Sequence, residues 1–182
     1  MTHEPTTMEH VYGPIPSRRL GQSLGISPIP RKYCNYSCIY CQLGRTDHLT
    51  HEREEFFDVG EIVAEFEEVL RTGTPFDVVT IVGEGEPTLY LRLGDLIAAL
   101  AARTDRPVAV ITNGALLTHP DVREELGRAD IVIVTFSAWD EASFRRIHRP
   151  HPSIRFEAFL EGLRAFARTC GGQLWIGVML LR

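Results

Sequence analysis

Three cysteines stand within eight residues of the chain and are the side chains best suited to metal chemistry. They follow the spacing Cys34-x3-Cys38-x2-Cys41, and the fourth cysteine, Cys170, is remote. Three thiolates can hold three irons of a cubane [4Fe–4S] cluster, whereas electron-transfer clusters usually have cysteine at all four irons. The fourth iron is then open to a small molecule with amine and carboxylate groups. The spacing therefore predicts an iron–sulfur centre that also binds a ligand.

Two other interpretations of the same cysteines remain. A Cys3His zinc site would add His48 to Cys34, Cys38 and Cys41, and would make the chain a zinc-binding module. The other interpretation is a non-catalytic iron–sulfur protein for redox sensing or electron transfer, which a fourth protein ligand or an absence of small-molecule binding would favour. The cysteine loop lies inside an alternation of strand and helix signals rather than in a small zinc module, which favours the cluster.

The elements that must position these cysteines alternate along the chain. Short apolar runs rich in β-branched residues predict strands that are buried on both faces, and amphipathic segments between them predict helices. A capping box at Asp58 and a stop at Gly73 mark the first helix. Strands are expected over residues 20–29, 78–82, 108–112, 131–136 and 174–181, and helices begin near 58, 93, 118, 140 and 156.

This order predicts an α/β fold with a parallel sheet, either doubly wound or part of a (β/α) barrel. In both architectures the chemistry collects at the carboxyl ends of the strands. The cysteine loop, residues 83–87, Asn113 and Ser137 each follow a predicted strand. We therefore expect them to form one shared site.

The composition is that of an ordinary globular protein with one domain. The 182 residues are 44% apolar and 24% charged, and the net charge of −5 argues against a general grip on nucleic acid. Residues 1–10 are polar and expected to be frayed. The sequence shows no secretory signal and no apolar run of the roughly 18 residues that a bilayer requires. Clustered cysteines fit a reducing, cytoplasmic location without a membrane.

The cysteine loop resembles that of the radical S-adenosylmethionine (SAM) superfamily, which places it after the first strand of a partial (β/α) barrel. Tyr40 stands at the aromatic position that precedes the third cysteine in that family. Residues 12–21 and 41–46 further resemble an uncharacterised iron–sulfur oxidoreductase subgroup related to wybutosine-type tRNA-modifying enzymes. The resemblance covers nearly the whole chain, so residues 1–182 are expected to form one radical SAM core domain.

The resemblance implies two cofactors, a [4Fe–4S] cluster on Cys34, Cys38 and Cys41 and a SAM molecule on its open iron. It also implies that Tyr40 packs near the adenine of SAM.

Residues 83–87, Gly-Glu-Gly-Glu-Pro, are similar to the family's GGEP motif, although Glu84 stands where a glycine is common. By this similarity Gly85 and Glu86 hold the methionyl ammonium of SAM. Asn113 and Ser137 would contact its ribose or carboxylate, while Asn113-Gly114 also fits a plain turn.

The reaction implied by the resemblance is reductive cleavage of SAM to a 5′-deoxyadenosyl radical, which removes a hydrogen from a substrate. The electron would come from a donor such as flavodoxin or ferredoxin. The substrate is left open among tRNA, a small molecule and a protein. The family core has six strands and the sequence predicts five, so we expect the C-terminal end of the core to lie outside this chain or to come from a partner.

Overall fold

The computed structural model describes residues 8–180, and a mixed sheet of six strands crosses this part of the chain in the order β1-β2-β5-β6-β7-β8. Strands β2, β5, β6, β7 and β8 run parallel, and β1 pairs antiparallel with β2. The expected α/β fold with a mostly parallel sheet is confirmed. The strands are β1 (Val11–Ser17), β2 (Gly21–Ile26), β5 (Val78–Ile81), β6 (Val108–Thr112), β7 (Ile131–Thr135) and β8 (Gln173–Gly177).

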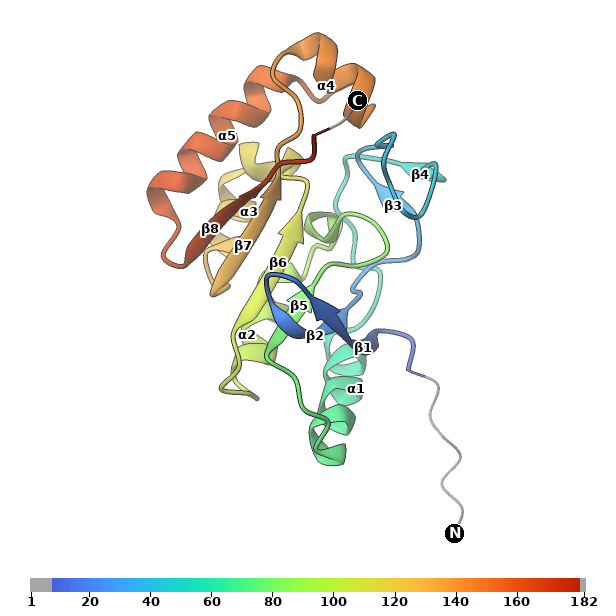
Figure 1. Ribbon diagram of the computed structural model, residues 1–182, viewed down its shortest axis with the longest axis vertical. Coiled ribbons are helices and arrows are strands. Elements are labelled where there is room, and N and C mark those ends of the chain that lie inside the picture. The colour runs from blue at the N-terminus through green and yellow to red at the C-terminus, as the bar shows by residue number, and fades with distance from the viewer. Residues whose placement is uncertain (1–7, 181–182) are drawn as a thin grey trace.

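The helices connect the parallel strands. In Figure 1, α2, α3 and α5 lie on one side of the strands, and the arrowheads of β6, β7 and β8 point toward the end that carries α4. No helix within residues 8–180 is long and apolar enough to cross a membrane. The helices are α1 (Val59–Thr72), α2 (Leu93–Ala101), α3 (Pro120–Leu126), α4 (Glu141–His148) and α5 (Phe156–Thr169), with 3₁₀ turns η1 (Pro87–Leu89) and η2 (Ala115–Thr118).

Local sequence explains where α1 begins and ends. The Asp58 side chain accepts a hydrogen bond from the amide of Gly60, and Gly73 ends the helix with a φ of 68°. The predicted start and stop are therefore confirmed. A capping box would require the Asp58 side chain to accept from the amide of Glu61. It accepts from Gly60 instead, so the predicted capping box is wrong.

The two faces of the sheet have different surroundings because side chains alternate along each strand. Val110 and Val132 belong to the large core that the helices cover, which also contains Phe66. Ala109 and Ile133 belong to a smaller apolar cluster with Leu20 and Val78 on the opposite face. On this second face, Leu20 and Ile133 line a pocket.

Strand β1 is the main element that the sequence pattern did not predict. Its residues Tyr12-Gly13-Pro14-Ile15-Pro16 carry two prolines and a glycine, which argue against a strand. An edge strand tolerates them because one side of it makes no ladder bonds, and β1 is the first strand in the sheet order.

The expected fraying of residues 1–10 is wrong for its last two residues. The Glu65 carboxylate accepts hydrogen bonds from the amides of Glu9 and His10, at 2.9 and 2.8 Å. His10 is buried. Residues 1–7 and Leu181, the predicted end of the last strand, lie outside the described residues.

The cysteine loop has its own small support. Two short strands, β3 (Tyr33–Cys34) and β4 (His48–Leu49), pair in parallel and close the loop at its base. The Tyr33 and His48 rings stack at 4.3 Å between centroids. The loop is therefore a folded unit at the carboxyl edge of the sheet.

Candidate active site

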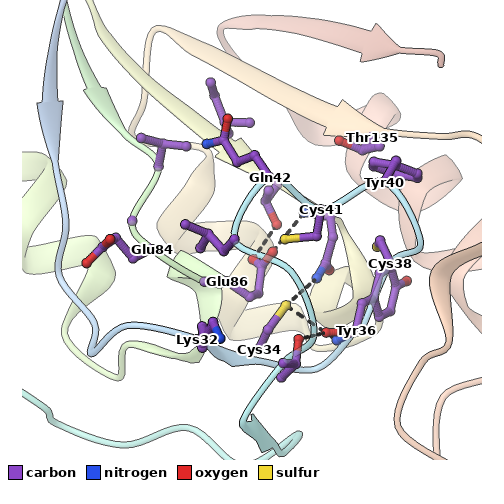
Figure 2. A pocket seen from close by; sticks show the side chains of 18 of the residues that line it. Lys32, Cys34, Tyr36, Cys38, Tyr40, Cys41, Gln42, Glu84, Glu86 and Thr135 are labelled. Atoms are coloured by element: carbon purple, nitrogen blue, oxygen red, sulfur yellow. Dashed lines mark hydrogen bonds between the residues drawn. The ribbon is translucent and has the colours of Figure 1, made fainter.

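A pocket of about 200 Å³ lies where the cysteine loop meets the carboxyl ends of β5, β6 and β7. Figure 2 shows its labelled side chains, with Cys34, Cys41 and Glu86 turned toward its middle. The predicted residues Cys34, Cys38, Tyr40, Cys41, Gly85, Glu86 and Asn113 all line it, together with Lys32, Tyr36, Gln42, Leu43, Gly44, Thr46, Val82, Gly83, Glu84, Ile111, Thr112 and Thr135.

The thiols of the loop are half-buried and held by nearby polar groups. The Cys34 sulfur accepts a hydrogen bond from the Tyr36 amide at 3.4 Å and lies 3.7 Å from Nδ2 of Asn113. The Cys38 sulfur lies 3.4 Å from Nδ1 of His148. These contacts position two of the three sulfurs.

Backbone contacts join the glycine-acid segment to the cysteine loop. The amide of Lys32 donates to the Glu84 carbonyl at 2.6 Å, and the amide of Glu86 donates to the Tyr33 carbonyl at 3.0 Å. A Cβ atom on Gly85 would stand 1.9 Å from the Tyr33 carbonyl oxygen. Only glycine fits there, so Gly85 permits the close approach of the two segments.

Glu86 is buried and its carboxylate is already hydrogen-bonded. Oε1 accepts from the amide and hydroxyl of Thr88 at 3.0 and 2.5 Å and from the Thr112 hydroxyl at 2.5 Å. Oε2 accepts from the Asn113 amide at 2.8 Å. Burial raises the pKa of this carboxyl, although the hydrogen bonds from Asn113, Thr112 and Thr88 act to lower it. Glu86 thus ties η1 to the end of β6, and Oε2 has one donor where an oxygen can accept two.

The two polar residues expected after β6 and β7 differ in position. Asn113 faces the loop, because its Nδ2 donates to Oδ1 of Asn35 at 2.6 Å. Ser137 is not among the pocket-lining residues; its hydroxyl accepts from the Met179 amide at 3.1 Å. At the end of β7 the residue that lines the pocket is Thr135. A SAM contact by Ser137 stays a prediction.

Sequence reasoning missed two polar residues beside the thiols. His148, at the end of α4, is 2% exposed, and its Nδ1 lies 3.2 Å from the Tyr40 hydroxyl as well as near Cys38. Tyr36 lines the pocket, and its hydroxyl is buried without a partner among the described residues. The sequence carried no clear signal for His148, because 110 positions separate it from Cys38.

The electrostatic surroundings favour the neutral form of the Cys34 and Cys38 thiols when no cation is bound. Burial raises the pKa of Cys34, and the nearby Glu86 charge raises it further. Burial also raises the pKa of Cys38, to about 12. A metal centre is the kind of local charge that reverses such a shift and holds cysteine as thiolate. The donor set therefore fits an iron–sulfur cluster, which supplies positive charge in the midst of the three sulfurs.

The same geometry disfavours the zinc interpretation. Within residues 8–180, no three His, Cys, Asp or Glu side chains gather closely enough to hold one metal ion. His48, the fourth zinc ligand in that interpretation, stacks on Tyr33 and does not line the pocket. Ligands of a cubane bind three separate irons and so stand farther apart than ligands of one ion.

The fold and pocket define a class of protein, namely parallel α/β proteins with a three-cysteine loop at the carboxyl edge of the sheet. The family model described as "Radical SAM superfamily" matches residues 29–182. The chain belongs to this superfamily, whose enzymes use a [4Fe–4S] cluster and SAM. The suspected wybutosine-related subgroup stays a prediction.

Several curated proteins are similar to most of the chain. It is 41% identical over 174 residues to a protein named GTPase Obg of Brachyspira hyodysenteriae, covering 96% of this chain and 26% of that protein. It is 40% identical to a UPF0026 protein of Methanocaldococcus jannaschii (96% and 54% covered) and 38% identical to one of Synechocystis (97% and 66%). The chain thus spans about a quarter to two-thirds of the length of these relatives.

Solved structures share the fold. SuiB of Streptococcus suis matches with a TM-score of 0.59 at 20% identity, covering 85% of this chain and 32% of SuiB. SuiB bound to SAM matches with a TM-score of 0.54 at 18% identity, covering 81% and 30%. At these identities the likeness concerns the fold alone.

Proposed function

We propose that this chain is the catalytic core of a radical SAM enzyme, with Cys34, Cys38 and Cys41 holding the [4Fe–4S] cluster. The observation that carries the proposal is that three thiols and the glycine-acid segment, far apart in sequence, line one pocket. When bound and reduced, the cluster supplies the electron that splits SAM into methionine and a 5′-deoxyadenosyl radical for hydrogen abstraction.

The protein's own residues bind and orient SAM. Oε2 of Glu86 has a free acceptor site for the SAM ammonium, and Gly85 keeps backbone rather than side chain at that wall. Tyr40 is the aromatic surface for the adenine. Asn113, and more remotely Ser137, offer polar groups for the ribose or carboxylate.

The enzyme would work with an external one-electron donor such as flavodoxin or ferredoxin. An oxygen-sensitive cluster further favours a reducing, cytoplasmic setting.

The test is anaerobic reconstitution with iron and sulfide, followed by dithionite and SAM. We expect 5′-deoxyadenosine from the wild type. Cys38→Ala should lose the cluster absorbance and the product, whereas Cys170→Ala should keep both because Cys170 lies outside the pocket.

Other outcomes would select the alternatives. A fully loaded cluster without SAM binding would indicate a non-catalytic iron–sulfur protein. Purified protein that contains zinc but no iron or sulfide would indicate a zinc-binding module. Retention on tRNA at about 0.15 M salt would support a tRNA-modifying enzyme, since weak electrostatic binding fades there.

A further inference from the structure

A second pocket, of about 210 Å³, adjoins the cysteine-lined one on the face of the sheet that carries Leu20 and Ile133. The two pockets share Tyr40, Ile111 and Thr135 as lining residues. A molecule in the second pocket would therefore touch the same side chains as SAM in the first. Hydrogen abstraction requires that the reacting atoms be held in van der Waals contact, so this neighbour is where a substrate belongs.

The second pocket has a mostly apolar wall and one cation. Arg19 is the charged side chain among its lining residues in the described part of the chain, and the others are Ser17, Leu20, Tyr40, Ile111, Ile133, Thr135, Gly177, Val178 and Met179. The hydroxyls of Ser17, Tyr40 and Thr135 add hydrogen-bonding groups. This lining suits a molecule with a hydrocarbon part and an anionic end.

Arg19 reaches this pocket from the opposite edge of the sheet. It lies in the turn between β1 and β2, yet its Nη1 is 3.7 Å from the position that a Cβ on Gly177 of β8 would occupy. Within residues 8–180 no carboxylate lies within ion-pair distance of Arg19. A guanidinium without a partner at a pocket mouth is a ready site for a carboxylate or phosphate, which it can bind with two hydrogen bonds.

We propose that the second pocket binds the substrate as a small organic anion whose carboxylate or phosphate pairs with Arg19. The proposal rests on the proposed radical SAM function. The small volume and the net charge of −5 favour a small molecule over a nucleic acid backbone. Substrate selection would thus depend on a residue outside the cluster and SAM site.

The first experiment measures binding without turnover. The rate at which phenylglyoxal modifies Arg19 in the cluster-loaded protein is measured by mass spectrometry. Succinate or inorganic phosphate is added as the probe that could protect Arg19. We expect at least threefold slower modification of Arg19 with one of them, and the protecting probe tells carboxylate from phosphate. Arg18, exposed and outside the pocket, is the internal control. Equal rates with and without both probes would overturn the proposal.

The second experiment measures 5′-deoxyadenosine formation with a deproteinised cell extract split on an anion-exchange resin. We expect the retained fraction to accelerate SAM cleavage by the wild type. Arg19→Gln should lose at least tenfold of that acceleration. Arg18→Gln should behave as wild type.

The outcomes separate the two proposals. If Arg19→Gln leaves the acceleration unchanged, the proposal of an anionic substrate is wrong, although the proposed SAM cleavage stands. The same conclusion follows if tRNA accelerates SAM cleavage and neither small-molecule fraction does. A wild-type protein with a full cluster and no SAM cleavage contradicts the proposed function instead, and the protection experiment then decides whether Arg19 binds anions.

Discussion

The Tyr36 hydroxyl is a buried donor without a described partner, next to the thiols of the cysteine loop. Burial raises its pKa well above the usual value, so it stays protonated and able to donate. An unsatisfied buried donor destabilises a protein, and its removal is favourable. In the loaded protein, a sulfur of the cluster that Cys34, Cys38 and Cys41 would hold could accept this hydrogen bond.

Tyr36→Phe should therefore stabilise the cluster-free protein, by about 1 kcal/mol. In the loaded protein that gain should vanish, and the midpoint potential of the cluster should fall because a hydrogen bond to sulfur is lost. Urea unfolding and a redox titration check the two parts. Tyr90→Phe is the matched control, because the Tyr90 hydroxyl donates to the Phe57 carbonyl at 2.7 Å and its loss should destabilise. A destabilised Tyr36→Phe protein would mean that the hydroxyl has a partner.

His148 gives the cluster-free protein a dependence on pH. Burial lowers its pKa from 6.5 to about 4. Between these values the unfolded chain binds a proton that the folded chain does not, so stability falls as the pH drops from 6.5 toward 4.

Between pH 7 and about pH 5, the wild type should lose about 2 kcal/mol more than His148→Gln. Urea midpoints at the two pH values measure this difference. His119→Gln, at an exposed histidine, should follow the wild type. A pH dependence that His148→Gln leaves intact would place the lost stability elsewhere.

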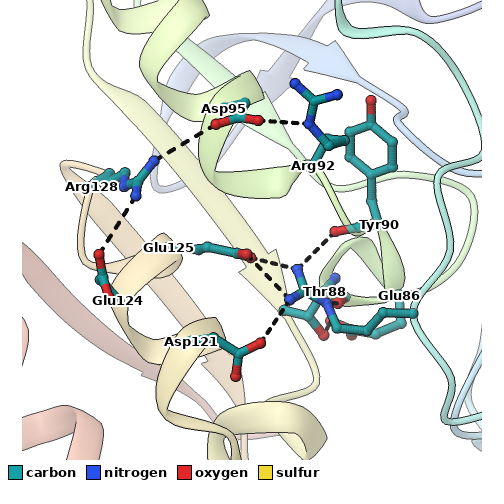
Figure 3. Close-up of polar contacts among 10 residues, drawn as sticks. Glu86, Thr88, Tyr90, Arg92, Asp95, Asp121, Glu124, Glu125 and Arg128 are labelled. Atoms are coloured by element: carbon teal, nitrogen blue, oxygen red, sulfur yellow. Dashed lines mark hydrogen bonds and ion pairs between the residues drawn. The ribbon is translucent and has the colours of Figure 1, made fainter.

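At the scale of elements, Arg53 joins its own segment to η1 and to α3. Figure 3 shows the residues it contacts, namely Thr88, Tyr90, Asp121 and Glu125. Its side chain is 11% exposed and donates to the carbonyls of Thr88 and Tyr90, both at 2.9 Å. It also pairs with Asp121 and Glu125 of α3, at 3.3 and 2.5 Å. Arg53 thus secures η1, which carries Glu86 as its N-cap, to the rest of the fold.

Arg53→Met should destabilise the protein by about 3 kcal/mol, because it leaves the half-buried Glu125 charge without its partner. Arg103→Met breaks the exposed pair with Glu67 and should cost less than about 1 kcal/mol. Denaturant unfolding of both variants gives the comparison. Similar small losses in the two would show that Arg53 contributes no more than a surface charge.

The sequence predicted the elements whose signal is local. The buried strands, the Gly73 stop and the early Pro120 of α3 follow from periodicity and from the backbone limits of glycine and proline. Strand β1 was missed because its prolines are compatible only with an edge, and position in a sheet is not a local property. His148, Tyr36 and Arg19 were not assigned, since their roles depend on contacts across the fold.

At the scale of the whole molecule, stability should be highest in the middle of the sheet. Strands β5, β6 and β7 have neighbours on both sides, and β1 and β8 are the two ends of the strand order. We expect amide hydrogen exchange to be slowest in β6 and clearly faster in β8, whose residues are mostly half-exposed. Hydrogen exchange measured by mass spectrometry tests this prediction. Equal protection factors for β8 and β6 would contradict it.

The pocket is assembled from segments that emerge from the ribosome at very different times. The thiols come from residues 34–41, whereas the opposite walls come from Gly83–Glu86, Thr112 and Thr135, and the histidine beside Cys38 is residue 148. When the three cysteines of a nascent chain have been synthesised, the residues that form the rest of the pocket have not. We therefore expect stable cofactor insertion to follow the folding of these segments against one another rather than the synthesis of the cysteine loop alone.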